Sequence, residues 1–179
     1  MPQYAGHYRE IQTEYRILMA GCQNSIAKQR ARPGKLEKQL NCIQINLQHS
    51  RLATDNLLKI IEEEGTDILC IQEPCTIGNK IVGLPRSYKV FASGEGRKRA
   101  AIVINNKQID TILITQLSDE DTVVLETKVD NVRLIIASMY FDINRPIDID
   151  LQKMEAMLAH AKGVGIILPA REVKYWRDF

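Results

Sequence analysis

The sequence lacks the residue patterns of several common classes of protein. Its four cysteines include no C-x-x-C pair, and its three histidines are widely scattered, so no zinc site is predicted. Two of the cysteines, Cys42 and Cys70, fall inside predicted strands. We therefore expect the thiols to stay reduced rather than form disulfides, as in a cytosolic or nuclear protein. The residues concerned are Cys22, Cys42, Cys70, Cys75, His7, His49 and His160.

Long apolar runs are also missing. No stretch approaches the eighteen or so consecutive apolar residues of a membrane span, so no membrane partner is expected. The first residues do not form a secretory signal, because Arg9, Glu10, Glu14 and Arg16 interrupt the apolar stretch that a signal needs. With 45% hydrophobic and 26% charged residues, the 179-residue chain has the composition of a soluble globular protein with one main domain. We expect an intracellular protein, nuclear or cytoplasmic.

A strong overall charge is absent, since the formal net charge is only +2. Residues 1–40 contain seven Lys or Arg against three Glu, whereas residues 41–179 contain slightly more acidic than basic side chains. Bulk charge therefore does not identify the main domain as a nucleic-acid binder. Any electrostatic contact with phosphate would come from local patches or from the basic first segment.

The chain divides into three predicted parts. In residues 1–39, an amphipathic helix is followed by a basic linker at 28–38 that Pro33 and Gly34 interrupt. The helix either binds a partner or packs on its own domain, and the linker either contacts nucleic acid or is a solvated tether. Residues 40–168 form the main domain, and residues 169–179 match no pattern. The apolar stripe of the helix consists of Tyr4, Tyr8, Ile11, Tyr15 and Leu18.

A strand, helix and strand between residues 40 and 74 organise the main domain. Apolar residues alternate around 43–47, and a short apolar run at 68–71 suits a buried strand. Between them, Ser50 is a predicted helix N-cap, and Gly65 stands where a helix would end in a left-handed residue. Such a connection usually joins parallel neighbours, so both strands are expected to end at the same edge of a sheet.

Asn46 and Glu73 lie at those two strand ends. A carboxylate and a carboxamide brought together suit a hard cation such as Mg²⁺, which takes a few oxygen ligands and keeps several waters. We therefore predict that both residues bind a metal. The alternative is that Glu73, which precedes Pro74, is an ordinary exposed loop residue.

The second half of the domain is predicted to be mainly β-structure. A strand is expected near 89–92, and four more follow as an antiparallel meander at 100–105, 111–117, 122–129 and 132–138. Together with the parallel unit they imply a mixed sheet. A helix opened by Asp148 and Asp150 should then bury Leu151, Met154, Leu158 and Ala161 and end at Gly163, before a last strand at 164–168.

A basic turn is predicted at 93–99. Its Arg97, Lys98 and Arg99 are candidates for contacts with a DNA backbone, which position a protein but carry no sequence information. The alternative is a solvated hairpin tip. The glycine spacing here superficially resembles a phosphate-binding loop, but no helix start follows it.

Several of these segments together resemble a known family. They are Ile-Asn-Leu at 45–47, Ile-Gln-Glu-Pro at 71–74, the Gly-Leu-Pro to Phe-Ala stretch at 83–92 and Ala-Ser-Met-Tyr-Phe-Asp at 137–142. In this order they are similar to the endonuclease/exonuclease/phosphatase superfamily, especially the endonuclease domain of non-LTR (LINE-type) retrotransposons. The resemblance runs from about residue 40 to about residue 167.

The resemblance implies an α/β fold, a DNase I-like four-layer sandwich in which mixed β-sheets are flanked by helices. It also implies hydrolysis of phosphodiester bonds that depends on Mg²⁺ (or Mn²⁺), with the target-strand backbone of DNA as partner and no small-molecule cofactor. Asn46 and Glu73 would bind the metal. Tyr140 matches a tyrosine that the family places beside the scissile phosphate, where a phenol can donate to a phosphate oxygen.

The sequence departs from the family after the last predicted strand. The family continues into Asp-x-Asn and later Ser-Asp-His motifs, whereas this chain has Leu-Pro-Ala-Arg at 168–171 and neither motif. We therefore expect a C-terminally truncated domain in which the nuclease is catalytically impaired, because groups that act together are lost. The alternatives are a non-catalytic nucleic-acid-binding fragment and a phosphomonoesterase of the same fold.

Overall fold

The computed structural model describes residues 40–129, 132–162 and 164–167. The predicted N-terminal helix and linker, Gly163 and the tail lie outside these residues. The elements, in chain order, are β1 (Cys42–Asn46), α2 (Arg51–Glu64), β2 (Ile68–Gln72), β3 (Thr76–Ile77), β4 (Lys80–Ile81), β5 (Lys89–Phe91), β6 (Ala100–Ile104), β7 (Asp110–Leu113), a 3₁₀ turn (Thr115–Leu117), β8 (Thr122–Val129), β9 (Val132–Met139), α3 (Ile147–His160) and β10 (Gly165–Ile167).

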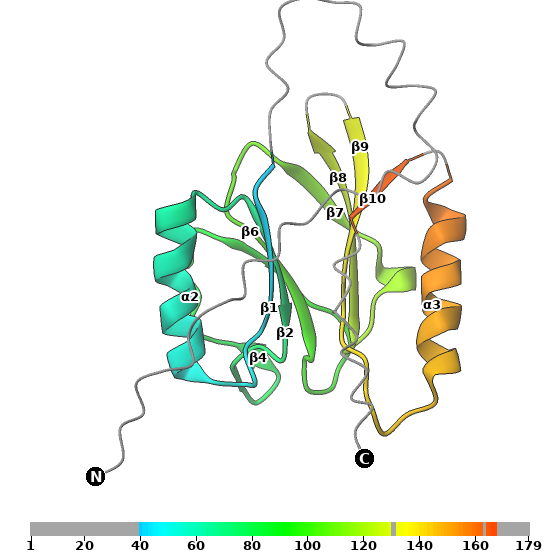
Figure 1. Ribbon diagram of the computed structural model, residues 1–179, viewed down its shortest axis with the longest axis horizontal. Helices are drawn as coiled ribbons and strands as arrows, with labels where there is room; N and C mark the ends of the chain where they lie inside the picture. Colours follow the sequence, from blue (N-terminus) through cyan, green and yellow to red (C-terminus); the bar gives the residue numbers. More distant parts are fainter. Residues whose placement is uncertain (1–39, 130–131, 163, 168–179) are drawn as a thin grey trace, which may run out of the picture.

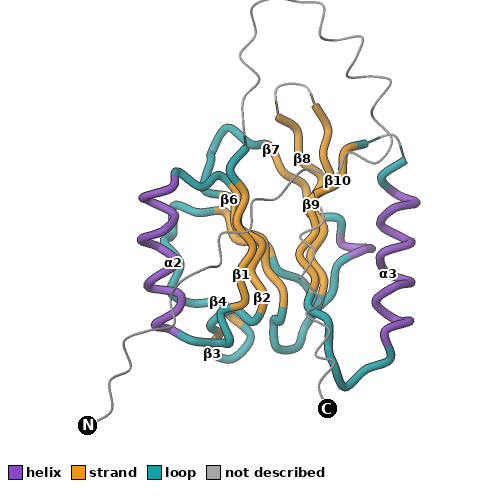
Figure 2. The backbone as a smooth tube through the Cα atoms, in the orientation of Figure 1, coloured by secondary structure: helices purple, strands orange, loops and turns teal. Residues whose placement is uncertain are grey.

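The elements stack in four layers. One sheet has the strand order β1-β2-β6-β5, and a second has the order β10-β9-β8-β7. The two sheets face each other, with α2 covering the outer side of the first and α3 the outer side of the second (Figures 1 and 2). The short β3-β4 hairpin lies beside the end of the first sheet. This arrangement confirms the predicted DNase I-like sandwich of mixed sheets and flanking helices.

The strand-helix-strand unit forms as its sequence predicts. The Ser50 hydroxyl accepts a hydrogen bond from the Ala53 N–H at the start of α2, and Gly65 ends the helix with a φ of 60°. The helix buries Leu57 and Ile61 against the first sheet. β1 and β2 then pair in parallel, which puts their carboxyl ends at one edge.

Strand β6 is the main difference from the predicted topology. Ala100–Ile104 is not part of the later meander, because it pairs antiparallel with β2 on one side and β5 on the other. All five of its residues are buried. A strand that is apolar on both faces suits the middle of a covered sheet, whereas β7, β8 and β9 form the meander. The predicted strand at 111–117 also stops at Leu113 and continues as the 3₁₀ turn.

The largest apolar cluster lies between the two sheets. Ile68, Ile102 and Ile104 from the first sheet pack with Leu125 and Ile136 from the second. All five side chains are almost completely removed from solvent. Their burial contributes roughly 1.5–3 kcal/mol each, so this layer holds the two sheets together.

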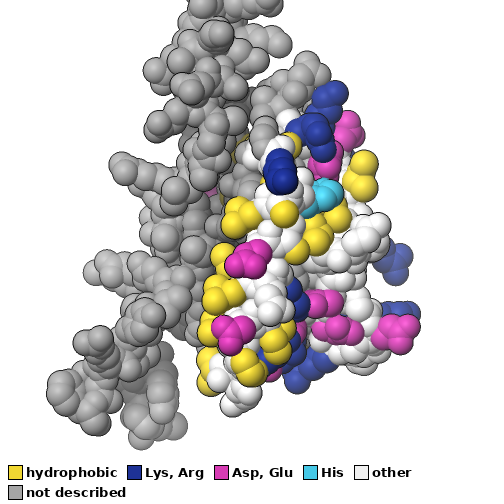
Figure 3. Space-filling view, turned by 90° about the vertical axis from the view of Figure 1, so that its right-hand side faces the viewer, with side chains coloured by type: hydrophobic (Ala, Val, Ile, Leu, Met, Phe, Trp, Pro, Cys, Tyr) yellow, Lys and Arg dark blue, Asp and Glu magenta, His cyan; other side chains and the backbone are white. Residues whose placement is uncertain are grey.

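The buried face of α3 differs from the predicted one. Asp150 and Met157 are buried and Met154 is half-buried, whereas Leu151 and Leu158 remain 47% and 49% exposed. Asp150 forms an ion pair with Arg145 at 2.6 Å in this buried position. The spacing of apolar residues in the sequence does not reveal a buried acid of this kind. Figure 3 views this side of the molecule and shows hydrophobic side chains on its surface. Within the described ranges, no helix is long and apolar enough to cross a membrane.

Candidate functional site

The site is assembled where β2 of the first sheet meets β9 of the second. Gln72 donates a hydrogen bond through Nε2 to the Met139 carbonyl at 2.6 Å, and the Ser138 hydroxyl donates to the Ile71 carbonyl at 3.2 Å. These bonds join the carboxyl ends of the two strands. The residues that follow, Glu73 and Tyr140, are therefore brought to the same place from different sheets.

Asn46 reaches the same edge through the parallel pairing of β1 and β2. It is the register partner of Gln72, and partners in adjacent strands project from the same face of a sheet. Since Gln72 extends toward the second sheet, Asn46 leaves the first sheet on that side. Its Oδ1 accepts a hydrogen bond from the Gln48 N–H at 2.8 Å, which orients the amide.

The backbone around this edge is conformationally unusual. Gln48, His49 and Glu73 have φ angles of 48°, 56° and 46°, in the left-handed region that residues other than glycine rarely occupy. The conformation interrupts the alternation of side chains after β2, so Glu73 can face Tyr140. The Glu73 N–H donates to the Arg99 carbonyl at 2.7 Å, and the His49 N–H donates to the Glu73 carbonyl at 2.8 Å. Such strain concentrates at functional sites.

His49 is a member of the site that the sequence did not reveal. Its Nδ1 lies 3.0 Å from the Pro74 carbonyl, which can only accept, so Nδ1 carries a proton. Its Nε2 lies 3.7 Å from Glu73 Oε1. The imidazole therefore faces the Glu73 carboxylate with its Nε2 atom. The sequence could not identify His49, because a single histidine without a second metal ligand at a characteristic spacing forms no recognisable motif.

Tyr140 is coupled to Glu73 across the site. Burial raises the pKa of Tyr140, and the charge of Glu73, together with a side-chain hydrogen bond to it, raises that pKa further. The nearby Arg99 guanidinium opposes this shift. The phenol is consequently protonated at neutral pH and can act as a hydrogen-bond donor.

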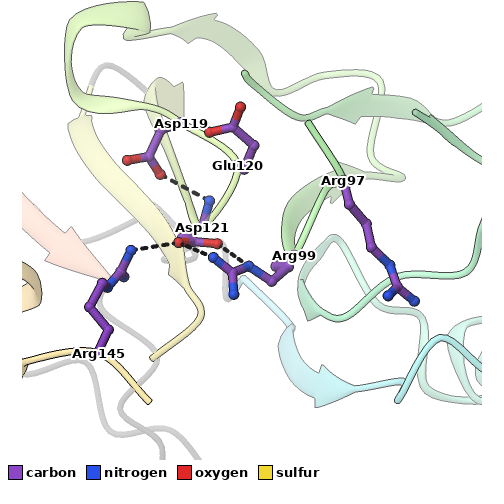
Figure 4. A pocket seen from close by; sticks show the side chains of 6 residues that line it. All are labelled: Arg97, Arg99, Asp119, Glu120, Asp121 and Arg145. Atoms are coloured by element: carbon purple, nitrogen blue, oxygen red, sulfur yellow. Dashed lines mark hydrogen bonds and ion pairs between the residues drawn. The ribbon is translucent and has the colours of Figure 1, made fainter. Parts of the chain in front are cut away.

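Arg99 is held by two carboxylates beside the Tyr140 ring. Figure 4 shows its pairing with one of them, Asp121. Its Nε and Nη2 donate to the two oxygens of Asp121 at 2.5 and 2.7 Å, and its Nη1 donates to Asp142 at 2.7 Å. Its guanidinium carbon lies 5.2 Å from the centre of the Tyr140 ring, within range of a cation–π contact. Burial by itself would lower the pKa of Arg99, but the two carboxylates outweigh it and raise that pKa.

Arg145 extends this network into the second sheet and α3. It donates to Asp121 at 2.9 Å and to Asp150 at 2.6 Å. The Asp121 side chain is only 5% exposed and thus bridges two arginines in a nearly dry environment. The network connects the start of β8, the loop after β9 and the first turn of α3.

The three basic residues predicted to contact DNA lie in different environments. Arg99 is engaged by Asp121 and Asp142, and Lys98 is buried with its ammonium group bound to the Gly94 carbonyl. Arg97 alone of the three is exposed. The predicted turn therefore presents one cation to solvent and uses the other two internally.

The donor set around Glu73 is compatible with a hydrated divalent cation. Asn46 and Glu73 supply one amide and one carboxylate side chain at a shared edge, and Mg²⁺ commonly uses one or two protein oxygens while keeping waters. The described part of the chain contains no group of three or more His, Cys, Asp or Glu arranged to bind a metal. A cation here would take most of its ligands from water and substrate.

Solved structures of similar fold are known, although no family model matches the sequence and no curated protein is significantly similar to it. The endonuclease domain of TRAS1, a telomere-specific non-LTR retrotransposon, is 27% identical with a TM-score of 0.60, covering 68% of this chain and 53% of that chain. A D. rerio TDP2 humanized by 14 mutations is 11% identical with a TM-score of 0.50, covering 69% and 56%. An AP endonuclease from Archaeoglobus fulgidus is 22% identical with a TM-score of 0.45, covering 70% and 52%.

The chain spans about half the length of these structures. Its described residues have the α/β fold of endonuclease/exonuclease/phosphatase proteins, and they are similar to the retrotransposon endonuclease domain over about two thirds of the chain. The resemblance predicted from the sequence is therefore confirmed at the level of fold.

Proposed function

We propose that the chain carries part of the active site of a divalent-metal-dependent nuclease that acts on the phosphodiester backbone of DNA. The main support is the position of Glu73 and Tyr140, which two different sheets bring into electrostatic contact. The similarity to a retrotransposon endonuclease domain supports the same chemistry.

In this proposal each residue has a separate task. Asn46 and Glu73 hold Mg²⁺ or Mn²⁺ at the shared edge of β1 and β2. When bound, the ion supplies positive charge that offsets the charge developing on the phosphate. Tyr140 donates a hydrogen bond to a non-bridging phosphate oxygen, and its raised pKa keeps the donor proton in place.

Arg99 supports this arrangement without contacting the phosphate. Its pairing with Asp121 and Asp142 fixes the guanidinium beside the Tyr140 ring. Its carbonyl also accepts the Glu73 N–H, so one residue positions both the phenol and the carboxylate. A preorganised hydrogen-bond donor stabilises the transition state more than a mobile one, because little reorganisation is needed during the reaction.

We further propose that this chain by itself is catalytically impaired. The Asp-x-Asn motif, whose acid helps to activate the attacking group in the family, is replaced by Leu-Pro-Ala-Arg at 168–171. Loss of one member of a cooperating catalytic set commonly reduces the rate by about 10³-fold or more. The residues proposed to bind the metal and the phosphate, Asn46, Glu73 and Tyr140, would then remain without an efficient general base. In that state the chain would bind nucleic acid without cleaving it.

Metal binding tests the site independently of cleavage. We expect Mn²⁺, followed by electron paramagnetic resonance, to bind the wild-type chain and to bind Glu73→Ala at least about tenfold more weakly, since even residues that only support a ligand contribute about that much. Glu63→Ala is the matched control, because Glu63 is an exposed acid on α2. Equal affinities for all three proteins would refute the proposed site.

Plasmid nicking with Mg²⁺ then tests the proposed impairment. We expect background nicking by both the wild type and Glu73→Ala. Nicking by the wild type that disappears in Glu73→Ala would overturn the impairment while supporting Glu73 as part of the active site.

A further inference from the structure

The loop at 94–96 surrounds a carboxylate that comes from a distant part of the chain. Glu120 Oε1 accepts the N–H groups of Glu95 and Gly96 at 2.9 and 3.0 Å. Gly94 has a φ of 81°, and a Cβ at this position would overlap the Glu120 carboxyl group. The glycine therefore allows both the turn of the loop and the close approach of the anion.

The loop has the chemistry of an anion site. Successive N–H groups that converge in a turn form a concavity of partial positive charge, which binds carboxylates and phosphates alike. The pKa of Glu120 is lowered first by the Gly96 N–H, then by its own N–H and that of Glu95. Burial opposes this shift, and the charge of Lys98 adds to it. The site thus favours a negatively charged occupant.

The main chain at Glu120 is anchored by hydrogen bonds that do not involve its carboxylate. Its carbonyl accepts the N–H groups of Arg99 and Ala100 at 2.8 and 3.0 Å, so the main chain is anchored. The carboxylate is held by the two loop N–H groups at the end of a flexible side chain. Rotation of that side chain alone would open the loop.

Of the three arginines that line the neighbouring pocket, Arg97 has no ion pair with a described residue. The loop adjoins a pocket of about 510 Å³, whose lining residues are Arg97, Arg99, Asp119, Glu120, Asp121 and Arg145 (Figure 4). Asp121 is neutralised by two arginines, and Asp119 pairs with Lys153 at 2.5 Å. Arg97 forms no ion pair with any residue that the structure describes.

We propose that the N–H groups of Glu95 and Gly96, together with Arg97, form a second phosphate site for the backbone of a nucleic-acid strand, and that Glu120 occupies it as a competitor built into the chain. The site lies next to the candidate active site, because the Arg99 carbonyl that follows the loop accepts the Glu73 N–H. A strand whose phosphate displaces Glu120 would extend from the loop toward Glu73. The inference depends on the proposed function only for the identity of the ligand.

Three substitutions separate competition from a general change in charge. Glu120→Asp keeps the charge but shortens the arm, Glu120→Gln removes the charge, and Glu95→Gln removes the same charge from an exposed side chain whose N–H remains in the loop. The measurement is the affinity of a fluorescein-labelled single-stranded oligonucleotide in EDTA at low salt. We expect Glu120→Asp and Glu120→Gln to bind roughly three- to tenfold more tightly than wild type, and Glu95→Gln to change by less than about twofold.

The opposite pattern would overturn the inference. If Glu120→Asp binds the oligonucleotide like wild type while Glu120→Gln and Glu95→Gln gain affinity equally, net charge alone explains the effect. Adding Arg97→Ala to Glu120→Asp should remove the gain in affinity. A gain that is undiminished in this double variant also refutes the site. Because the assay contains no divalent metal, Glu73→Ala should leave the gain intact. A failure of the metal site and a failure of this phosphate site are therefore distinguishable.

Discussion

Arg99 stands between a buried carboxylate and an aromatic ring: it forms a two-bond ion pair with Asp121 while its guanidinium lies 5.2 Å from the centre of the Tyr140 ring. The pair joins residues from both sheets, because Arg99 precedes β6 and Asp121 precedes β8. The same residues that support the candidate site thus connect the sheets. Stability and positioning of Tyr140 are expected to change together when this pair is altered.

The Asp121 pair can be tested by unfolding. Asp121→Asn leaves Arg99 and Arg145 without their shared counter-charge in a nearly dry position, and we expect it to reduce the free energy of unfolding by about 2–4 kcal/mol. Urea denaturation measures the change. Asp55→Asn is the control, since it removes an exposed ion pair with Arg51 on α2 and should cost less than about 0.5 kcal/mol. Equal losses would show that the network contributes no more than a surface pair.

The ionisation of Tyr140 reports on its two charged neighbours. Because Glu73 raises the pKa of Tyr140 and Arg99 lowers it, Glu73→Gln should lower that pKa and Arg99→Met should raise it. Ultraviolet titration near 295 nm, with the trace of Tyr140→Phe subtracted in each background, isolates this residue. Shifts in the same direction for both variants would contradict the arrangement.

The same shift predicts how stability changes in alkali. The pKa of Tyr140 in the folded state lies above the ordinary tyrosine value of about 10. The protonated phenol therefore contributes to the free energy of unfolding below about pH 10, and this contribution is lost as the pH rises through the folded-state pKa. Tyr140→Phe should consequently lose less stability than wild type when the pH is raised from neutral to above about 10. Thermal melts at a series of pH values compare the two proteins. Parallel losses would show that Tyr140 does not carry the effect.

Gly94 can be tested against a glycine in open space. Gly94 and Gly78 both have positive φ, but a Cβ at Gly78 meets nothing within 4 Å, whereas one at Gly94 meets the Glu120 carboxyl group. Gly78→Ala should cost about 1 kcal/mol from backbone strain alone. Gly94→Ala should cost more, because Glu120 must also leave its two N–H partners. Equal costs in urea denaturation would indicate that these hydrogen bonds add no stability.

The thiols should differ in reactivity. Burial raises the pKa of Cys42 to about 11 and that of Cys70 beyond the range of a reactive thiol. Cys42 and Cys75 are both partly exposed, so the raised pKa rather than access protects Cys42. In a Cys22→Ser background, we expect one thiol, that of Cys75, to react with a disulfide reagent in the native state at pH 8. Cys42 and Cys70 should react after unfolding, and Cys75→Ser should remove the fast phase. A fast phase that survives this substitution would contradict the assignment.

Features that depend on neighbouring residues were predictable from the sequence. Ser50 and Gly65 are the two ends of α2 because a cap involves only residues within one turn of the helix. The parallel pairing of β1 and β2 follows from the handedness of the crossover, which needs no knowledge of the rest of the chain. The shared edge of Asn46 and Glu73 was predictable for that reason, whereas their binding of a metal remains a prediction.

The sequence by itself therefore determined the first unit and, through the order of its motifs, the fold. Only the tertiary structure decided that Ala100–Ile104 joins the first sheet, that Asp150 rather than Leu151 faces inward, and that Arg99 serves the interior rather than the surface. The physical reason is that ion pairs and strand pairings between residues far apart in the chain produce no periodic pattern in the local sequence. Arg99 and Asp142 are 43 residues apart, and their contact exists only once both sheets are in place.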